Sequence, residues 1–264
     1  MLMEVKNQIK ATFLSIKYAI QRELLNKFTF ISNVIFMIIN NGCFIVQWVI
    51  LYSIKDDVGG YTFKQVLLLW GIAALTFGIS RFLFKTSFSL SEVINSGKLD
   101  NYLIQPKNVL ISCITSSVEI SALGDIIYGL IMITLFGLSI KNVILFIFCG
   151  ICGALVLSSI SIIFSSLSFW FGRTEIITNT VNSLMLNFAT YPEGIFNGII
   201  KYMFYTIIPL GVTTYIPVQL ITNFTLDNFL LIIIYTIFFV TLAFIIFYKG
   251  LKRYSSTNLM NARV

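Results

Sequence analysis

Long apolar segments separated by short polar turns dominate the sequence. A helix that crosses the hydrocarbon core of a membrane needs about 20 predominantly apolar residues. We predict six such spans, at residues 30–52, 66–84, 118–138, 143–171, 176–190 and 229–248. This pattern predicts an all-α integral membrane protein with six transmembrane helices.

The segment between the fifth and sixth spans, residues 191–224, follows a different pattern. It is apolar, but Gly198, Pro209, Gly211 and Pro217 interrupt it, so neither half is long enough to cross. Broken backbone is tolerated at membrane depth only where protein or water satisfies its polar groups. We therefore expect two short re-entrant helices that enter the outer leaflet.

Residues 1–29 are predicted to form a basic amphipathic helix. Its apolar residues recur at three-to-four spacing, whereas its five cations lie at other positions: Lys6, Lys10, Lys17, Arg22 and Lys27. A helix of this kind lies in the plane of the membrane surface. The chain then divides into this cytoplasmic interfacial helix, a transmembrane domain at 30–250 and a cytoplasmic tail at 251–264.

The composition agrees with a membrane protein. Hydrophobic residues make up 57% of the chain and charged residues only 11%, too few to cover the surface of a soluble protein. With the N-terminus inside, 14 Lys and Arg lie on the cytoplasmic side and 4 on the outer side. The positive-inside rule therefore predicts that both ends are cytoplasmic. It also accounts for the net charge of +7 without a nucleic-acid partner.

Motifs for catalysis or nucleotide binding are missing from the sequence. The Gly97-Lys98 dipeptide lacks the spacing of the GxxxxGK[ST] phosphate-binding loop. The chain has no histidine, and Cys149 and Cys152 fall inside an apolar span, where small packing residues are the simpler interpretation. We expect no catalytic residues, no metal and no cofactor in this chain.

The predicted cytoplasmic segment 87–108 is longer than a connection between two helices requires. The residues leave two interpretations open, a solvated linker and a docking surface for a cytoplasmic partner.

This segment resembles a known family. The run from Val93 to Pro106 is similar to the GxLDxxLxxP segment of one subfamily of type-2 ABC transporter permeases. Tyr191-Pro192 resembles the second recurring segment of that subfamily. Chain length, the basic N-terminus and the broken segment before the last span fit as well.

The resemblance implies a permease subunit of an ABC exporter in the bacterial cell membrane. Two permeases, identical or homologous, would pair, and two copies of a separate subunit would bind ATP and Mg²⁺. The resemblance makes 87–108 the coupling loop that the ATP-binding subunit contacts. The residues that it assigns to coupling are Gly97, Leu99, Asp100, Leu103 and Pro106.

The substrate of such an exporter would be an amphipathic or hydrophobic drug, peptide or lipid-like molecule. The alternative function is an ATP-independent membrane carrier, a channel or an immunity protein. Such a protein has no need for a coupling loop.

Polar residues inside the spans are candidates for a substrate path. Asn33, Asn40 and Gln47 repeat every seven residues and share one face of the first span, and Asn179, Asn182 and Asn187 cluster in the fifth. Hydrogen bonds between helices, each contributing roughly 1 kcal/mol, are the simpler interpretation. The resemblance places both spans near the dimer axis, which favours a path.

Two charges are predicted at similar depth in neighbouring spans. Arg81 lies near the inner end of the second span and Asp125 lies in the third, at depths that differ by about 3 Å. An unpaired charge at that depth is costly. We hypothesise that they pair or share water, with Glu119 as a competing partner for Arg81 and extension of Arg81 to the interface as the alternative.

Overall fold

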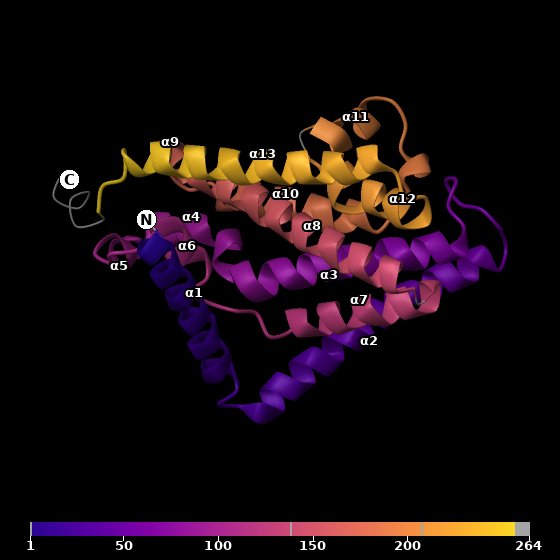
Figure 1. Ribbon diagram of the computed structural model, residues 1–264, viewed down its shortest axis with the longest axis horizontal. Coiled ribbons are helices and arrows are strands. Elements are labelled where there is room, and N and C mark those ends of the chain that lie inside the picture. Colours follow the sequence, from indigo (N-terminus) through magenta and orange to yellow (C-terminus); the bar gives the residue numbers. More distant parts are fainter. Residues whose placement is uncertain (1, 138, 207, 257–264) are drawn as a thin grey trace.

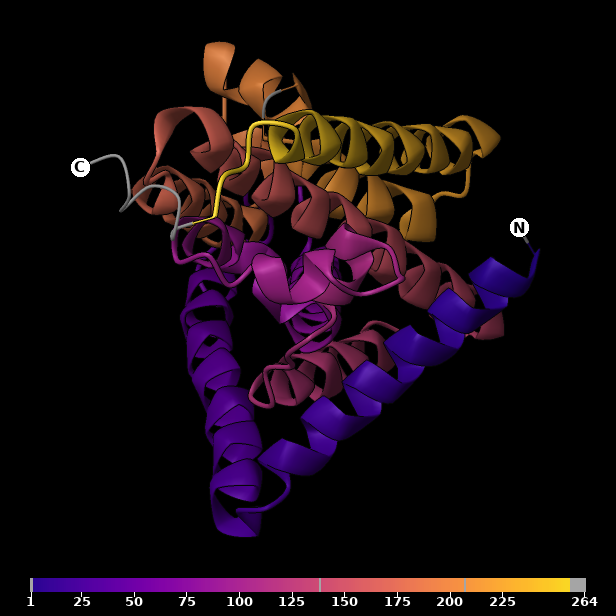
Figure 2. The ribbon, with the colours of Figure 1, turned by 90° about the vertical axis from the view of Figure 1, so that its left-hand side faces the viewer.

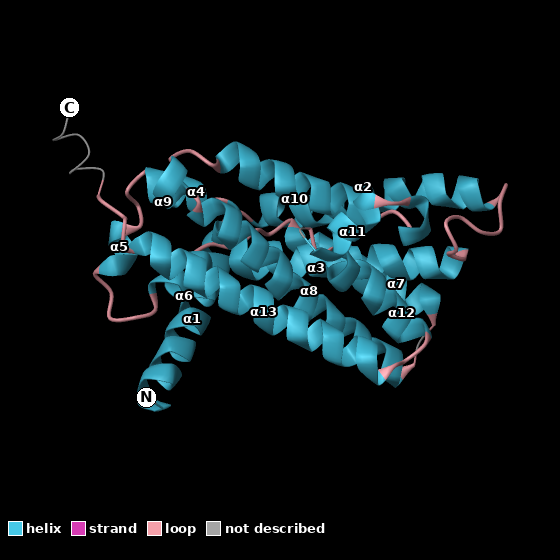
Figure 3. Cartoon of the chain, turned by 90° about the horizontal axis from the view of Figure 1, so that it is seen from above, coloured by secondary structure: helices cyan, strands magenta, loops and turns pink. Residues whose placement is uncertain are grey.

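The computed structural model describes residues 2–137, 139–206 and 208–256, and every regular element in these ranges is helical (Figure 1 and Figure 3). An all-helical fold, as the apolar pattern predicts, is confirmed. The elements are α1 (Leu2–Glu23), α2 (Lys27–Tyr52), α3 (Phe63–Phe88), α4 (Leu90–Asn95), α5 (Asp100–Leu103), α6 (Val109–Ile114), α7 (Ala122–Phe136), α8 (Ile140–Ser166), α9 (Ser168–Phe171), α10 (Glu175–Ala189), η1 (Glu193–Ile195), α11 (Ile199–Thr206), η2 (Gly211–Tyr215), α12 (Ile216–Thr222) and α13 (Leu226–Leu251).

Four helical segments in the described ranges have the length and composition of a membrane span. They are α2, α3 continued by α4, α8 continued by α9, and α13. Helices α7 and α10 occupy the predicted third and fifth spans, but each has only 15 residues, about 22 Å of helix. The number of six spans therefore stays a prediction.

The predicted break between the fifth and sixth spans is present. Helix α11 and the pair η2–α12 are bent by 75° relative to each other. This geometry fits either one broken span or two re-entrant helices, so the re-entrant arrangement stays a prediction.

The connections between helices separate into two ends of the bundle. The start of α1, the short helices α4–α6 and the end of α13 lie at one end, whereas the α2–α3 connection, the α7–α8 connection and α12 lie at the other (Figure 1). These groups coincide with the segments that the charge distribution assigns to the two sides of the membrane. The cytoplasmic identity of the first end stays a prediction based on that distribution.

The segment 87–108 is ordered, in contrast to the solvated linker that its polar residues allow. It forms α4 and α5, and Leu90 and Ile94 of α4 and Leu99, which precedes α5, are buried in one cluster with Leu110 and Phe247. This hydrophobic cluster, the end cluster, holds the segment against α13. The polar composition of segment 87–108 does not predict these helices, because they are held by apolar contacts with residues that are distant in the sequence.

The predicted third span also begins later than expected, at Ala122 instead of residue 118. The residues between α6 and α7 are irregular, and their side chains form hydrogen bonds with α3. The Thr86 hydroxyl forms hydrogen bonds of 3.1 Å with the Ser116 hydroxyl and 2.8 Å with the Ser117 hydroxyl. This stretch is packed against α1 and α3 through Val118 and Ile120, as irregular backbone at membrane depth requires.

Helix α3 is the centre of the bundle and packs between α7 and α8. Its approach to α7 depends on glycine. A Cβ atom on Gly129 would lie 2.8 Å from the Gly71 carbonyl oxygen and 3.1 Å from the Leu75 nitrogen. Helices α3 and α8 are also in close contact, since the Ser80 and Ser158 hydroxyls lie 2.6 Å apart. Small residues at these contacts permit the close packing on which membrane helix pairs depend.

We predict that Gly129→Ala destabilises the bundle by about 1–3 kcal/mol, because the added methyl group meets backbone atoms that cannot move freely. The measurement is thermal unfolding in detergent. Gly42→Ala is the matched control, since a Cβ there meets nothing within 4 Å. Equal melting temperatures of the two variants would contradict the packing account.

Candidate functional site

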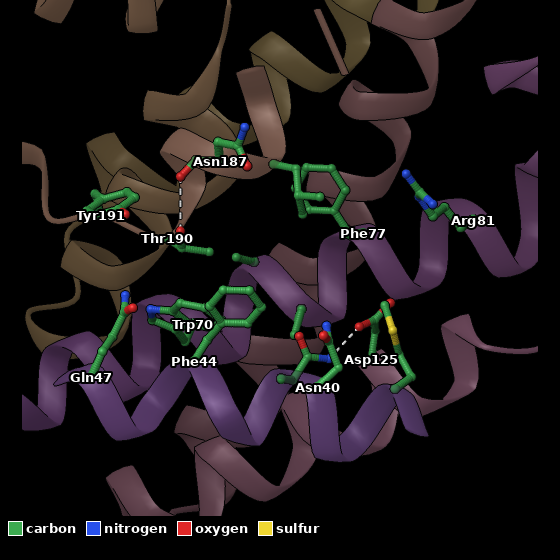
Figure 4. Close-up of a pocket in the computed structure, with 15 residues that line it drawn as sticks. Asn40, Phe44, Gln47, Trp70, Phe77, Arg81, Asp125, Asn187, Thr190 and Tyr191 are labelled. Carbon is green, nitrogen blue, oxygen red and sulfur yellow. Dashed lines mark hydrogen bonds between the residues drawn. The ribbon is translucent and has the colours of Figure 1, made fainter. Parts of the chain in front are cut away.

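A cavity of about 280 Å³ opens beside α3 between α2 and α10 (Figure 4). Helices α2, α3, α7 and α10 supply its walls, together with the turn after α10. The residues that line it are Met37, Asn40, Asn41, Phe44, Gln47, Trp70, Ala73, Ala74, Phe77, Arg81, Asp125, Leu186, Asn187, Thr190 and Tyr191. We call it the lateral cavity.

One part of the lateral cavity combines aromatic rings with amides. The rings of Phe44 and Trp70 stack at a centroid distance of 5.8 Å, and Asn40, Gln47 and Asn187 are exposed side chains on its walls. Helix α2 leaves this side open, since only 6% of its apolar window is buried in the described structure. The cavity therefore offers apolar surface and hydrogen-bonding groups to whatever lies beside α2 and α10.

The other part of the cavity holds a buried carboxylate. Asp125 is 5% exposed, and the Asn41 side-chain nitrogen donates a 2.6 Å hydrogen bond to one of its carboxylate oxygens. Gly124 allows α2 to come this close, because a Cβ there would lie 2.6 Å from the Val34 carbonyl oxygen. The amide of Asn41 thus solvates a charge that lipid cannot.

Among the ion pairs of the described residues, none joins Arg81 directly to Asp125. The Arg81 guanidinium lies 3.5 Å from a Glu119 carboxylate oxygen and 5.5 Å from the centre of the Phe88 ring. Arg81 therefore contacts Glu119, the competing partner, which lies on the irregular stretch before α7. Arg81 and Asp125 nevertheless line the same cavity, so their interaction through water stays a prediction.

A second cavity, also of about 280 Å³, shares Arg81 and Leu186 with the first. Asn179 and Asn182 line this second cavity. Asn182 is buried, and its side-chain oxygen accepts a 2.8 Å hydrogen bond from Ser161, which fits the packing interpretation for this residue. Of the six amides predicted from the sequence, five line one cavity or the other, and Asn33 lines neither.

Several wall residues were not identified from the sequence. Trp70, Phe77 and Tyr191 line the lateral cavity, but nothing in an apolar segment distinguishes an aromatic residue that lines a cavity from one that packs. Trp70 Nε1 is buried without a hydrogen-bond partner among the described residues. Asn41 could have been identified from the sequence. It is an amide inside the first apolar span, and the third apolar span contains a carboxylate, Asp125, that needs a hydrogen-bond donor.

Two of the coupling residues predicted from the resemblance, Leu99 and Asp100, are held by contacts within the protein, and we call them the anchors. Leu103 and Pro106 are exposed. Gly97 has a φ of +73°, a conformation that glycine adopts without strain. Leu99 is fully buried in the end cluster, so a surface role for this side chain does not fit the structure. The Asp100 carboxylate accepts a 2.6 Å hydrogen bond from Ser256. Burial and the charge of Asp100 raise the pKa of Tyr254 above its ordinary value, so this neighbouring hydroxyl stays neutral.

The exposed part of this segment follows its anchors. Leu103 is 41% exposed and Ile104 is 83% exposed, and Pro106 is also exposed. These neighbouring side chains form a small apolar surface at the end of the bundle. We call residues 103–106 the exposed apolar turn.

We predict that Asn41→Leu destabilises the protein by about 1–3 kcal/mol or more, since it leaves a buried carboxylate without its donor. Asn40→Leu is the control, because this neighbouring amide is exposed and lines the same cavity. Adding Asp125→Leu to Asn41→Leu should restore most of the loss. Thermal unfolding of the four proteins in detergent tests this, and a loss that Asp125→Leu leaves unchanged would contradict it.

Comparison with known families gives a match over residues 34–258 to the family described as ABC-2 family transporter protein. Comparisons with curated proteins and with solved structures find no match. The family match runs from α2 to beyond the end of α13, and it includes the lateral cavity, the exposed apolar turn and the broken segment α11–α12. The chain therefore belongs to the ABC-2 family of membrane transport subunits.

Proposed function

We propose that this chain is the permease subunit of an ABC exporter. The lateral cavity carries the proposal. In this chain, a member of a transport family, the cavity is lined by aromatic rings and amides and lies next to α2, a helix that is mostly exposed. Such a lining suits an amphipathic or hydrophobic substrate, a drug, peptide or lipid-like molecule, because rings bury apolar surface and amides bond scattered polar groups. The substrate would pass between α2 and α10.

A second permease, identical or homologous, completes the path in this proposal. Asn40, Gln47 and Asn187 are exposed in the single chain, and an amide that faces lipid has no hydrogen-bond partner. A second copy that packs against α2 and α10 would enclose these amides and turn an open cavity into a closed route. Helix α13, whose apolar window is also mostly exposed, has few polar side chains and suits lipid.

Energy would come from a separate ATP-binding subunit, two copies per complex, which holds the ATP and Mg²⁺. In this proposal the exposed apolar turn is the contact, and the anchors Leu99 and Asp100 hold it in place. Movement of the turn would reach the bundle through the end cluster, which joins α4, α5, α6 and α13. An ordered segment with an exposed apolar surface favours this over an ATP-independent carrier, channel or immunity protein.

The proposed location is the bacterial cell membrane, with the end that carries α4, α5 and the end of α13 in the cytoplasm. The charge distribution supports this orientation. It also brings the exposed apolar turn to the side where ATP is present.

We predict that Ile104→Asp lowers the apparent affinity for the ATP-binding subunit by at least about tenfold, because an apolar anchor at the centre of an interface is replaced by a charge. Substrate export from reconstituted vesicles should fall with it. The measurements are co-purification of the ATP-binding subunit and ATP-driven export.

Ile54→Asp is the matched control, because Ile54 is 77% exposed and lies at the opposite end of the bundle. It should leave both quantities near those of the unmodified protein. Full export by a variant in which a Gly/Ser linker replaces residues 103–106 would overturn the coupling role, and export without any ATP-binding subunit would overturn the proposed function.

A further inference from the structure

A groove runs between α1 and the segment that leads into α6. Figure 2 shows α1 crossing the end of the bundle obliquely. Two adjoining hollows of about 520 Å³ and 780 Å³ form the groove, and both are lined by Asn7 and Lys107. This groove is separate from the lateral cavity and has no role in the proposed substrate path.

The walls of the groove are held in place by hydrogen bonds. The Gln8 side-chain oxygen accepts a 2.9 Å bond from the Asn108 backbone N–H, and the Ser15 hydroxyl donates a 3.1 Å bond to the Thr115 carbonyl. Asn108 also caps α6 through a 3.0 Å bond from the Ile111 N–H. The groove is therefore a formed feature, in which α1 is bonded to Asn108 before α6 and to Thr115 after it.

The charge of the groove is positive. Lys10 from α1 and Lys107 from the opposite wall line it, and the lining residues from position 6 onward, where side chains are described, include no Asp or Glu. Neither lysine belongs to an ion pair among the described residues. The side chains of Asn7, Ser15 and Tyr18 add neutral hydrogen-bonding groups. Two ammonium groups with neutral donors form a suitable environment for a phosphate.

Apolar residues lie beside these charges. Ile9 and Ile111 line the second hollow. Ile9 and Phe13, one helical turn apart, are 64% and 69% exposed, whereas Ile16 and Ile20, further along the same face of α1, pack against Val118 and Ile120. An exposed apolar stripe on a basic helix that leads directly into the first span is suited to contact acyl chains.

We propose that this groove binds the headgroup phosphate of an anionic phospholipid of the inner leaflet, with its acyl chains along Ile9 and Phe13. The bound lipid joins α1 to the segment that contains the exposed apolar turn. It thereby stabilises the surface that contacts the ATP-binding subunit, a consequence that rests on the proposed function. The binding site itself does not.

The experiment measures lipid binding to the purified permease alone. The protein in detergent is titrated with phosphatidylglycerol and with phosphatidylcholine, and bound lipid is counted by native mass spectrometry. Phosphatidylglycerol should bind more tightly. Lys10→Glu and Lys107→Glu should each weaken it by about fivefold or more, because one lysine near a membrane surface contributes about that factor to anionic lipid binding. Lys10→Arg should retain it.

Lys17→Glu is the matched control, since Lys17 is an exposed lysine of α1 that lines neither hollow. It should change the affinity by less than about twofold, a small effect for a charge outside the groove. If Lys17→Glu lowered the affinity for phosphatidylglycerol as much as Lys10→Glu does, the lipid would be attracted by the overall charge of α1, and the groove would not be a specific site.

Two further outcomes would overturn the proposal. Displacement of the lipid by millimolar inorganic phosphate would show that the groove takes free phosphate. Loss of the ATP-binding subunit from Lys10→Glu in phosphatidylcholine alone would show that the groove contacts that protein. Because lipid binding is measured without transport, a failure of export would count against the proposed function and leave the lipid site intact.

Discussion

Polar groups at membrane depth need partners within the protein, since hydrocarbon offers none. In the centre of this bundle three hydrogen bonds between helices supply such partners. The Ser80 and Ser158 hydroxyls bond between α3 and α8, Asn182 accepts from Ser161 between α10 and α8, and Asn41 donates to Asp125 between α2 and α7. The exposed amides Asn40, Gln47 and Asn187 line the lateral cavity together, so the same requirement predicts that a partner outside the single chain bonds to them.

The charges near the cavities follow the same rule in two different ways. Arg81 is balanced by Glu119 and by the face of the Phe88 ring, whereas Asp125 relies on the amide of Asn41. This difference places a paired cation and an amide-bound carboxylate on one cavity wall. A substrate with a few polar groups could contact both Arg81 and Asp125. It would not have to separate an ion pair between these two residues, and separating buried charges is costly.

Much of this architecture can be predicted from the sequence, because apolar length and interruptions by proline and glycine act locally. The helices at the six predicted spans and the break at α11–α12 are of this kind. What could not be predicted depends on contacts between distant residues. Leu99 is buried in a cluster that includes Phe247, near the end of α13, and Arg81 contacts Glu119, which is distant from it in the sequence. The aromatic wall of the lateral cavity gives no signal in an apolar segment, since Trp70 would look the same in a packed core.

A cross-link across the lateral cavity is the most direct test of the proposed passage of substrate between α2 and α10. Asn40→Cys and Asn187→Cys place thiols on opposite walls (Figure 4), in a protein whose exposed Cys43 is replaced by alanine. A bifunctional thiol reagent is applied to the complex with its ATP-binding subunit in vesicles, and ATP-driven export is measured before and after cleavage of the linker. The account predicts that export stops while the walls are joined and returns when the linker is cut, with each single-cysteine variant unaffected. Undiminished export by the cross-linked protein would contradict it.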